Sequence, residues 1–154
     1  MLFRSAGITV PMYLLRDGAL VAVPAPVDVS IEHGSPTRRA AAAMEALMAV
    51  KPRQESPYQN LWGRLCRLGT GVRSVEHVAA RHLVVVRLEG RAGDLCDLRT
   101  DALVLREQQL AWTVLTNLGL DATTSVRVLG PDGRRVTGPP DVVPDASLLA
   151  TPRG

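Results

Sequence analysis

The stretch QLAWTVLTNLGLDATTSVRVLGPDG (residues 109–133) changes from a helical pattern to a strand-like pattern at a single glycine. Gly119 suits the left-handed position that ends a helix, with Leu120 folding back onto Leu115. Beyond it, SVRV alternates apolar and polar residues, and Pro-Asp-Gly predicts a turn. Before it, an apolar stripe at helical spacing comprises Leu110, Ala111, Val114, Leu115 and Leu118. The stretch therefore predicts a helix followed by a strand.

Trp112 lies beside this stripe, in a chain with two Trp, two Tyr and one Phe. It could serve as a ligand platform, a partner anchor or a core residue. We predict a packing role at the shoulder of a helix–sheet interface, because tryptophan contributes a large apolar surface. The expected structural core comprises Met44, Leu47, Val85, Trp112 and Leu115.

The upstream sequence predicts a hairpin, a helix and a second hairpin. Asp17-Gly18 separates two β-rich runs and predicts a tight turn. Ser35 suits an N-cap and Pro36 a first helical position, ahead of an alanine-rich segment. VRSVEHVAARHLVVVRLEG (residues 72–90) then predicts a hairpin with a densely apolar central strand. The predicted fold is α+β, with two helices packed on one face of a mixed sheet.

Length and composition limit the classes of protein. A chain of 154 residues with 46% hydrophobic and 21% charged residues suits one globular domain. No apolar run reaches the length of a membrane span. The net charge is +3, but the arginines are scattered and Lys51 is the only lysine, so we expect no nucleic-acid partner. We place the domain at residues 8–136, followed by a proline-rich tail at 137–154.

The sequence contains no recognisable catalytic or cofactor motif. His33, His77 and His82 have none of the spacings of a metal site or a catalytic dyad. Helix-start aspartates after residue 93 suit capping and dipole roles. We therefore expect no enzyme, no cofactor, no metal and no catalytic residue. Cys66 and Cys96 form no CxxC pair, which leaves two buried thiols in a cytosolic chain or a disulfide in an exported one.

Four segments together resemble the GerMN domain, the sporulation and spore-germination domain. They are MYLLRDGALVAVPAPV, RAAAAMEALMAVKP, LGTGVRSVEHVAARHLVVVRLEG and, above all, QLAWTVLTNLGLDATTSVRVLGPDG. The resemblance covers roughly residues 10–136, and its motifs are structural patterns. It implies a fold similar to ring-building motifs and brings no enzymatic activity, cofactor or catalytic residue.

The resemblance also implies an extracytoplasmic place in the cell envelope, often as a lipoprotein. No export signal is visible, so we expect that Met1–Ser5 is not the native start and that a signal segment or lipid anchor lies upstream. With export inferred, Cys66 and Cys96 are expected to form a disulfide. The implied partners are other envelope proteins or further copies of the chain.

Two classes of function follow. The first is a non-catalytic module for protein–protein interaction or assembly, with or without a role in sporulation. The second is a small-ligand or envelope-polymer binding domain that would use Tyr58, Trp62 or the Arg134-Arg135 turn. For the first, a half-polar strand carrying Arg73 and Glu76 suits reversible pairing at a sheet edge or on the face opposite the helices.

Overall fold

A computed structural model describes residues 8–28, 30–31, 34–49, 55–60, 71–90, 100–136 and 141–150. Its elements follow the predicted order of hairpin, helix, hairpin, helix and strand, which confirms an α+β fold with two helices and a mixed sheet. They are β1 (Ile8–Arg16), β2 (Ala19–Val27), α1 (Pro36–Ala49), β3 (Gly71–Val78), β4 (Leu83–Glu89), α3 (Thr100–Leu118) and β5 (Ser125–Leu129). The described residues also include the single-turn 3-10 helices η2 (Ala79–Arg81) and η4 (Ala146–Leu148).

The hairpin of β1 and β2 is antiparallel along its whole length, from Ile8 opposite Val27 to Arg16 opposite Ala19. Asp17 and Gly18 form its turn and both have positive φ, at 53° and 78°. Aspartate tolerates this conformation and glycine adopts it without strain. The turn therefore has the form that the Asp-Gly pair predicts.

The mixed sheet that the sequence predicts has three strands, and β1 and β2 form a two-stranded sheet of their own beside it. Helix α3 occupies the outer edge of β1: the Tyr13 N–H donates to the Thr113 hydroxyl at 3.0 Å, and Asn117 Nδ2 donates to the Pro11 carbonyl at 2.7 Å. Leu15 exchanges two backbone hydrogen bonds with Gln59, which closes the end of the same edge. The backbone groups on the outer edge of β1 that a further strand would need for pairing are therefore already hydrogen-bonded at these positions.

The other sheet has the order β3-β4-β5, antiparallel between β3 and β4 and parallel between β4 and β5. The outer edge of β5 is covered by backbone bridges from Val126 to Val142 and from Leu129 to Arg135. Within the described residues, β3 pairs with β4 on one side and with no strand on the other. In the described part of the chain, its outer edge is therefore the open edge of this sheet.

Both helices have the ends that the sequence predicts. The Ser35 hydroxyl accepts the Arg38 N–H at 3.3 Å and caps α1. Beyond α3, Gly119 has a φ of 70°, its N–H donates to the Thr116 carbonyl, and the Leu120 N–H donates to the Leu115 carbonyl. This is the expected Schellman arrangement.

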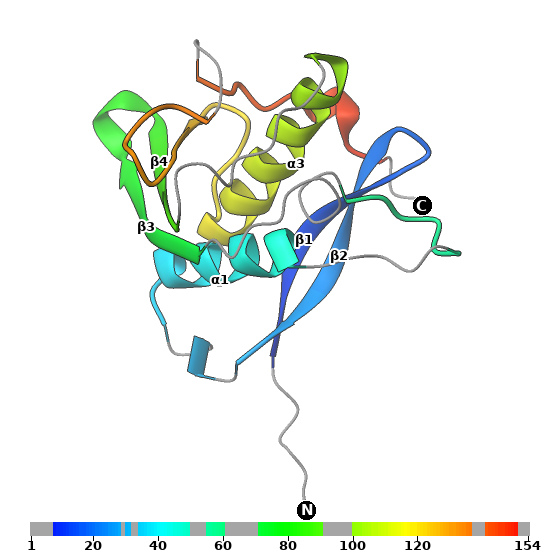
Figure 1. Cartoon of the computed structure of the whole chain (residues 1–154), viewed down its shortest axis with the longest axis horizontal. Helices are drawn as coiled ribbons and strands as arrows, with labels where there is room; N and C mark the ends of the chain where they lie inside the picture. The colour runs from blue at the N-terminus through cyan, green and yellow to red at the C-terminus, as the bar shows by residue number, and fades with distance from the viewer. Residues whose placement is uncertain are drawn as a thin grey trace, which may run out of the picture.

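The main core lies where the helices meet both sheets. Figure 1 shows α1 and α3 in the middle of the molecule, with β3 and β4 to the left and the β1–β2 hairpin to the right. Both helices and both sheets contribute buried apolar side chains to one cluster. Its members include Val10, Met12, Ala43, Met44, Leu47, Val84, Val86, Leu110, Val114, Leu115, Val126 and Val128.

Part of the region expected to be a proline-rich tail packs closely on the domain. Val142 is buried and bonds through its backbone to Val126. The Gln108 side chain, on α3, donates to the Val143 carbonyl and accepts the Asp145 N–H, both at 2.8 Å. Residues 141–150 therefore pack against α3 and β5.

Candidate interaction surface

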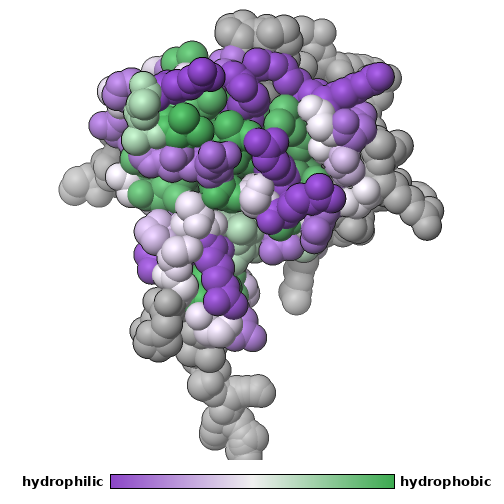
Figure 2. Space-filling model, turned by 90° about the vertical axis from the view of Figure 1, so that its left-hand side faces the viewer, coloured by the Kyte–Doolittle hydropathy of each residue, from purple (hydrophilic) through white to green (hydrophobic). Residues whose placement is uncertain are grey.

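The three-stranded sheet turns one face to the helices and the other away from them. Val84, Val86 and Val128 belong to the core cluster on the helix side. Because strand side chains alternate, Glu76 and Arg87 lie on the opposite face, where they form an exposed ion pair at 3.9 Å. Figure 2 views the molecule from the side on which β3 and β4 lie and shows hydrophobic residues bordered by hydrophilic ones.

The residues proposed for interaction, Arg73 and Glu76, both lie on β3 and both are exposed. Arg73 is the extra residue of a β-bulge, since Val72 pairs with Leu88 and Ser74 pairs with Arg87. Bulges of this kind are frequent on edge strands, where they interrupt regular pairing. The structure thus places the two residues on the open edge strand and the adjoining outer face.

A groove of about 520 Å³ separates this edge from α1. One wall is α1, the other is β3, and Ile31 lies at one end. Glu45 Oε2 accepts the Val72 N–H at 3.4 Å across the groove, which is a long hydrogen bond. The complete lining is Ile31, Thr37, Arg38, Ala41, Ala42, Glu45, Val72, Arg73, Ser74 and Val75.

The sequence prediction missed the α1 wall of this groove. It did name Met44 and Leu47 as core residues, and both are buried, as are Ala40 and Ala43 on the same face of the helix. It gave no role to Ala41 and Ala42, which are half-buried beside β3. The α1 wall could have been predicted from one signal in the sequence, which is the presence of small residues on the flank of an otherwise exposed helix face.

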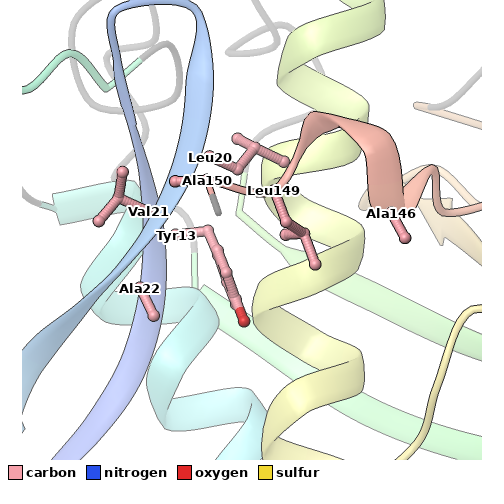
Figure 3. Close-up of a pocket in the computed structure, with 7 residues that line it drawn as sticks. All are labelled: Tyr13, Leu20, Val21, Ala22, Ala146, Leu149 and Ala150. Atoms are coloured by element: carbon pink, nitrogen blue, oxygen red, sulfur yellow. The ribbon is translucent and has the colours of Figure 1, made fainter. Parts of the chain in front are cut away.

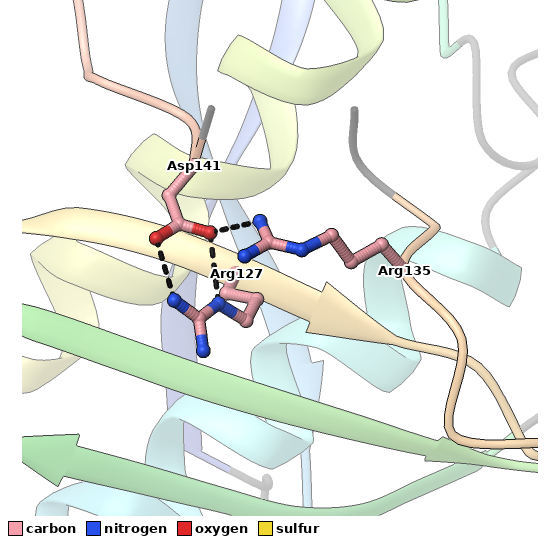
Figure 4. Close-up of polar contacts among 3 residues, drawn as sticks. All are labelled: Arg127, Arg135 and Asp141. Carbon is pink, nitrogen blue, oxygen red and sulfur yellow. Dashed lines mark hydrogen bonds and ion pairs between the residues drawn. The ribbon is translucent and has the colours of Figure 1, made fainter. Parts of the chain in front are cut away.

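Asp141, which comes after β5 in the chain, binds both Arg127 on β5 and Arg135 beyond it (Figure 4). It accepts hydrogen bonds from Arg127 Nε at 2.8 Å and Nη2 at 2.9 Å, and a further one from Arg135 Nη1. The Arg127 hydrogen bonds, with a contribution from Arg135, hold the pKa of the Asp141 carboxyl below its usual range. This ionised cluster ties Arg135 and Asp141 to the sheet.

Three other carboxyl groups have lowered pKa values for local reasons. Asp121 and Asp145 accept hydrogen bonds from the hydroxyls of Thr123 and Ser147, and Asp28 accepts the backbone N–H of Ser30. Each partner is two residues further along the chain, as in an Asx turn. The pKa shifts therefore have a structural cause in turn geometry.

A second groove, of about 570 Å³, lies where residues 146–150 meet the β1–β2 hairpin. Figure 3 shows Tyr13 and Leu149 projecting into the space between the hairpin and α3. The Tyr13 hydroxyl accepts a hydrogen bond from Thr116 at 3.2 Å. Apart from this hydroxyl the lining side chains are apolar, so the groove lacks the convergent polar side chains typical of a small-ligand site.

Trp112 lies behind Tyr13, with the ring centroids 6.4 Å apart and the planes inclined by 52°. It is 7% exposed and packs with Leu15 and Leu20 in a small second cluster. Within the described residues its Nε1 atom has no hydrogen-bond partner. The residue therefore occupies a buried packing position and presents no open platform.

The remaining sequence-predicted residues fall into two groups. Met44, Leu47 and Leu115 are fully buried and Val85 is 6% exposed, so all four lie inside the protein. Trp62, Cys66, Cys96 and His33 lie outside the described residues, and the disulfide stays a prediction.

The residues expected for ligand binding that the structure describes, which are Tyr58, Arg134 and Arg135, line neither of the two grooves above. Tyr58 is half-buried, and the Arg16 guanidinium lies 5.8 Å from the centre of its ring. Arg134 is exposed on the turn after β5, and neither residue lines either groove described above. No cluster of three or more metal-ligating side chains occurs in the described part of the chain.

Comparisons with protein-family models, curated proteins and solved structures give no match to this chain. Within the described ranges, each helix falls short of the length or the hydropathy needed to cross a lipid bilayer.

Proposed function

We propose that this protein is a non-catalytic interaction module of the cell envelope, and that it associates with a protein partner through β3. The observation that carries the proposal is the open edge of β3, with Arg73 and Glu76 exposed on it. An unpaired strand edge is a template for pairing with another chain. Its bulge and charged side chains favour specific, reversible association over aggregation.

The other strand edges of the molecule support the choice of β3. The edge of β1 is bonded to α3 and Gln59, and that of β5 to Arg135 and Val142. The edge of β2 is bonded to Ala150 at one end, and it carries prolines at positions 24 and 26. Pro11 and Pro24 face each other in the hairpin, and neither has an N–H to donate to the other strand. The nitrogen atoms of these prolines therefore face outward, so the outer edge of β2 lacks a hydrogen-bond donor at each proline.

The extracytoplasmic location and the link to sporulation or germination rest on the GerMN resemblance of the sequence. The same resemblance supports the absence of catalysis and the presence of an export segment or lipid anchor upstream. The natural partners would then be other envelope proteins or further copies of this chain. These parts of the proposal depend on the resemblance alone.

Charge reversal tests the surface. The double variant Arg73→Glu/Glu76→Arg should capture at least about 90% less partner from envelope extracts than the wild type. The reason is that each of the two charges facing the partner now has the opposite sign. Its melting temperature should stay close to that of the wild type, because exposed substitutions change stability by under about 0.5 kcal/mol.

The matched control is Asp132→Arg/Arg134→Glu, which reverses another exposed pair of opposite charges, on the turn after β5. It should capture the same proteins as the wild type in equal amounts. Equal capture by all three proteins would refute the proposal that β3 is the interaction surface.

A further inference from the structure

We propose that the groove between β3 and α1 binds an extended, acidic peptide segment of a partner protein, which adds as a strand to the open edge of β3. This inference rests on the proposed interaction function and specifies the chemistry of the partner. Pairing of a peptide with a sheet edge uses main-chain hydrogen bonds for affinity and side-chain pockets for specificity. The groove offers both.

The backbone of β3 supplies an outward-facing donor. The Val72 N–H points away from β4 and toward α1, where Glu45 Oε2 accepts it at 3.4 Å. Such a long hydrogen bond is weak, and a peptide carbonyl could replace the carboxylate at a better distance. Glu45 therefore acts as a displaceable cover for the edge, as charged side chains do on many edge strands.

The shape of the groove suits a single extended chain. Ala41 and Ala42 form the α1 wall, and their methyl groups keep that wall shallow. Val72 and Val75 are half-buried on the opposite side and give it an apolar base. In an added strand, every second side chain would point into this space. We expect small or branched apolar residues at those positions.

The charge of the groove selects an acidic segment. Arg38 on α1 and Arg73 on β3 both line it, and Glu45 is the one carboxylate among the described lining residues. Glu45 stands at the Val72 end, and Arg38 lies two helical turns earlier in α1. Arg73 directly follows Val72 in β3 and so lies at the Glu45 end. Acidic residues of the peptide would therefore meet Arg38 at one end of the groove and Arg73 at the other, while the peptide backbone displaces the Glu45 side chain.

The probe is an acetylated and amidated octapeptide of alternating valine and glutamate, and its counterpart has lysine in place of glutamate. Binding is followed by amide NMR shifts and by fluorescence anisotropy of labelled peptides. The glutamate peptide should shift amides of β3 and α1, and it should bind at least about tenfold more tightly than the lysine peptide. Glu45→Ala should tighten binding about threefold or more, because the edge donor is then uncovered.

Two variants test the groove itself. Ala42→Leu should narrow it, and Arg38→Glu should repel the acidic peptide, each weakening binding at least about tenfold. Arg134→Glu, which makes the same change of charge on a distant turn, should bind like the wild type. The amide spectra of all variants verify that they are folded.

The proposal is overturned if the glutamate peptide shifts no β3 or α1 amide at about 1 mM. It is also overturned if folded Ala42→Leu and Arg38→Glu both bind the peptide like the wild type. Should the groove variants still capture the natural partner while Arg73→Glu/Glu76→Arg does not, the groove is excluded and the outer face of β3 remains the surface. If none of the variants affects capture of the partner, both the groove proposal and the proposed function of β3 are refuted.

Discussion

The Thr113 hydroxyl on α3 accepts the backbone N–H of Tyr13 on β1 at 3.0 Å, so a helix side chain completes the edge of a strand. The same hydroxyl donates to the Gln109 carbonyl at 2.8 Å, and Thr113 is fully buried. Thr113→Val keeps the shape but leaves the Tyr13 N–H without its acceptor. We expect a loss of about 1–3 kcal/mol in the free energy of unfolding, measured by urea denaturation.

Thr9→Val is the matched control, because Thr9 is exposed on the same strand. This change should alter stability by less than about 0.5 kcal/mol. Equal effects of the two substitutions would mean that the hydrogen bond to Tyr13 contributes nothing to holding the hairpin on α3.

Trp112→Ala should destabilise the protein by about 3 kcal/mol, because it leaves a cavity among Leu15, Leu20 and Tyr13. Val104→Ala is the comparison on the same helix, since Val104 is 54% exposed and should tolerate the change. Chemical denaturation of both variants measures the difference. An unaltered midpoint for Trp112→Ala would contradict the packing role.

Local patterns predicted the elements of this fold well. The turn at Asp17-Gly18, the Ser35 cap and the end of α3 at Gly119 each depend on one or two neighbouring residues with special backbone or hydrogen-bonding properties. The buried faces of the helices depend on periodicity alone. Such features can be predicted because their causes lie close together in the sequence.

The division into two sheets could not be predicted in this way. It depends on contacts such as Asn117 with Pro11 and Thr113 with Tyr13, which join residues about a hundred positions apart. Alternation within a strand indicates which face is buried but not which element covers the edge. The groove beside β3 escaped prediction for the same reason, since Ala42 and Val75 meet only in the folded protein.

Cys66 and Cys96 are predicted to form a disulfide in the exported protein, and both lie outside the described residues. Counting from 66 to 96 inclusive, the bridge would close a loop of 31 residues. Loop-closure entropy then gives a stabilisation of about 3.5–4 kcal/mol, less any strain. Mass spectrometry of the oxidised protein, with and without alkylation, tests the bond. Two alkylated thiols in fully oxidised material would contradict it, as would Cα atoms more than about 7 Å apart.

Asp141→Asn should destabilise the protein in a pH-dependent manner, because the Asp141 carboxylate binds both Arg127 and Arg135. Its pKa is lowered in the folded state, chiefly by the Arg127 hydrogen bonds, so folding favours the ionised form. The stabilisation is therefore present above the unfolded pKa of about 3.9 and is lost as the pH falls through the lower folded value. The variant should be less stable by about 1 kcal/mol at pH 7.

The two proteins should become equally stable as the pH falls well below about 4, where the wild-type carboxyl is protonated. Thermal unfolding at a series of pH values measures this convergence. Asp132→Asn is the control, because its partner Arg134 lies at 4.0 Å with a side chain that is 88% exposed. That change should have little effect at any pH. A stability difference for Asp141→Asn that stays constant from pH 7 to acid would show that the amide loses packing or a hydrogen bond. It would also show that the charge of Asp141 has no part in binding Arg127 and Arg135.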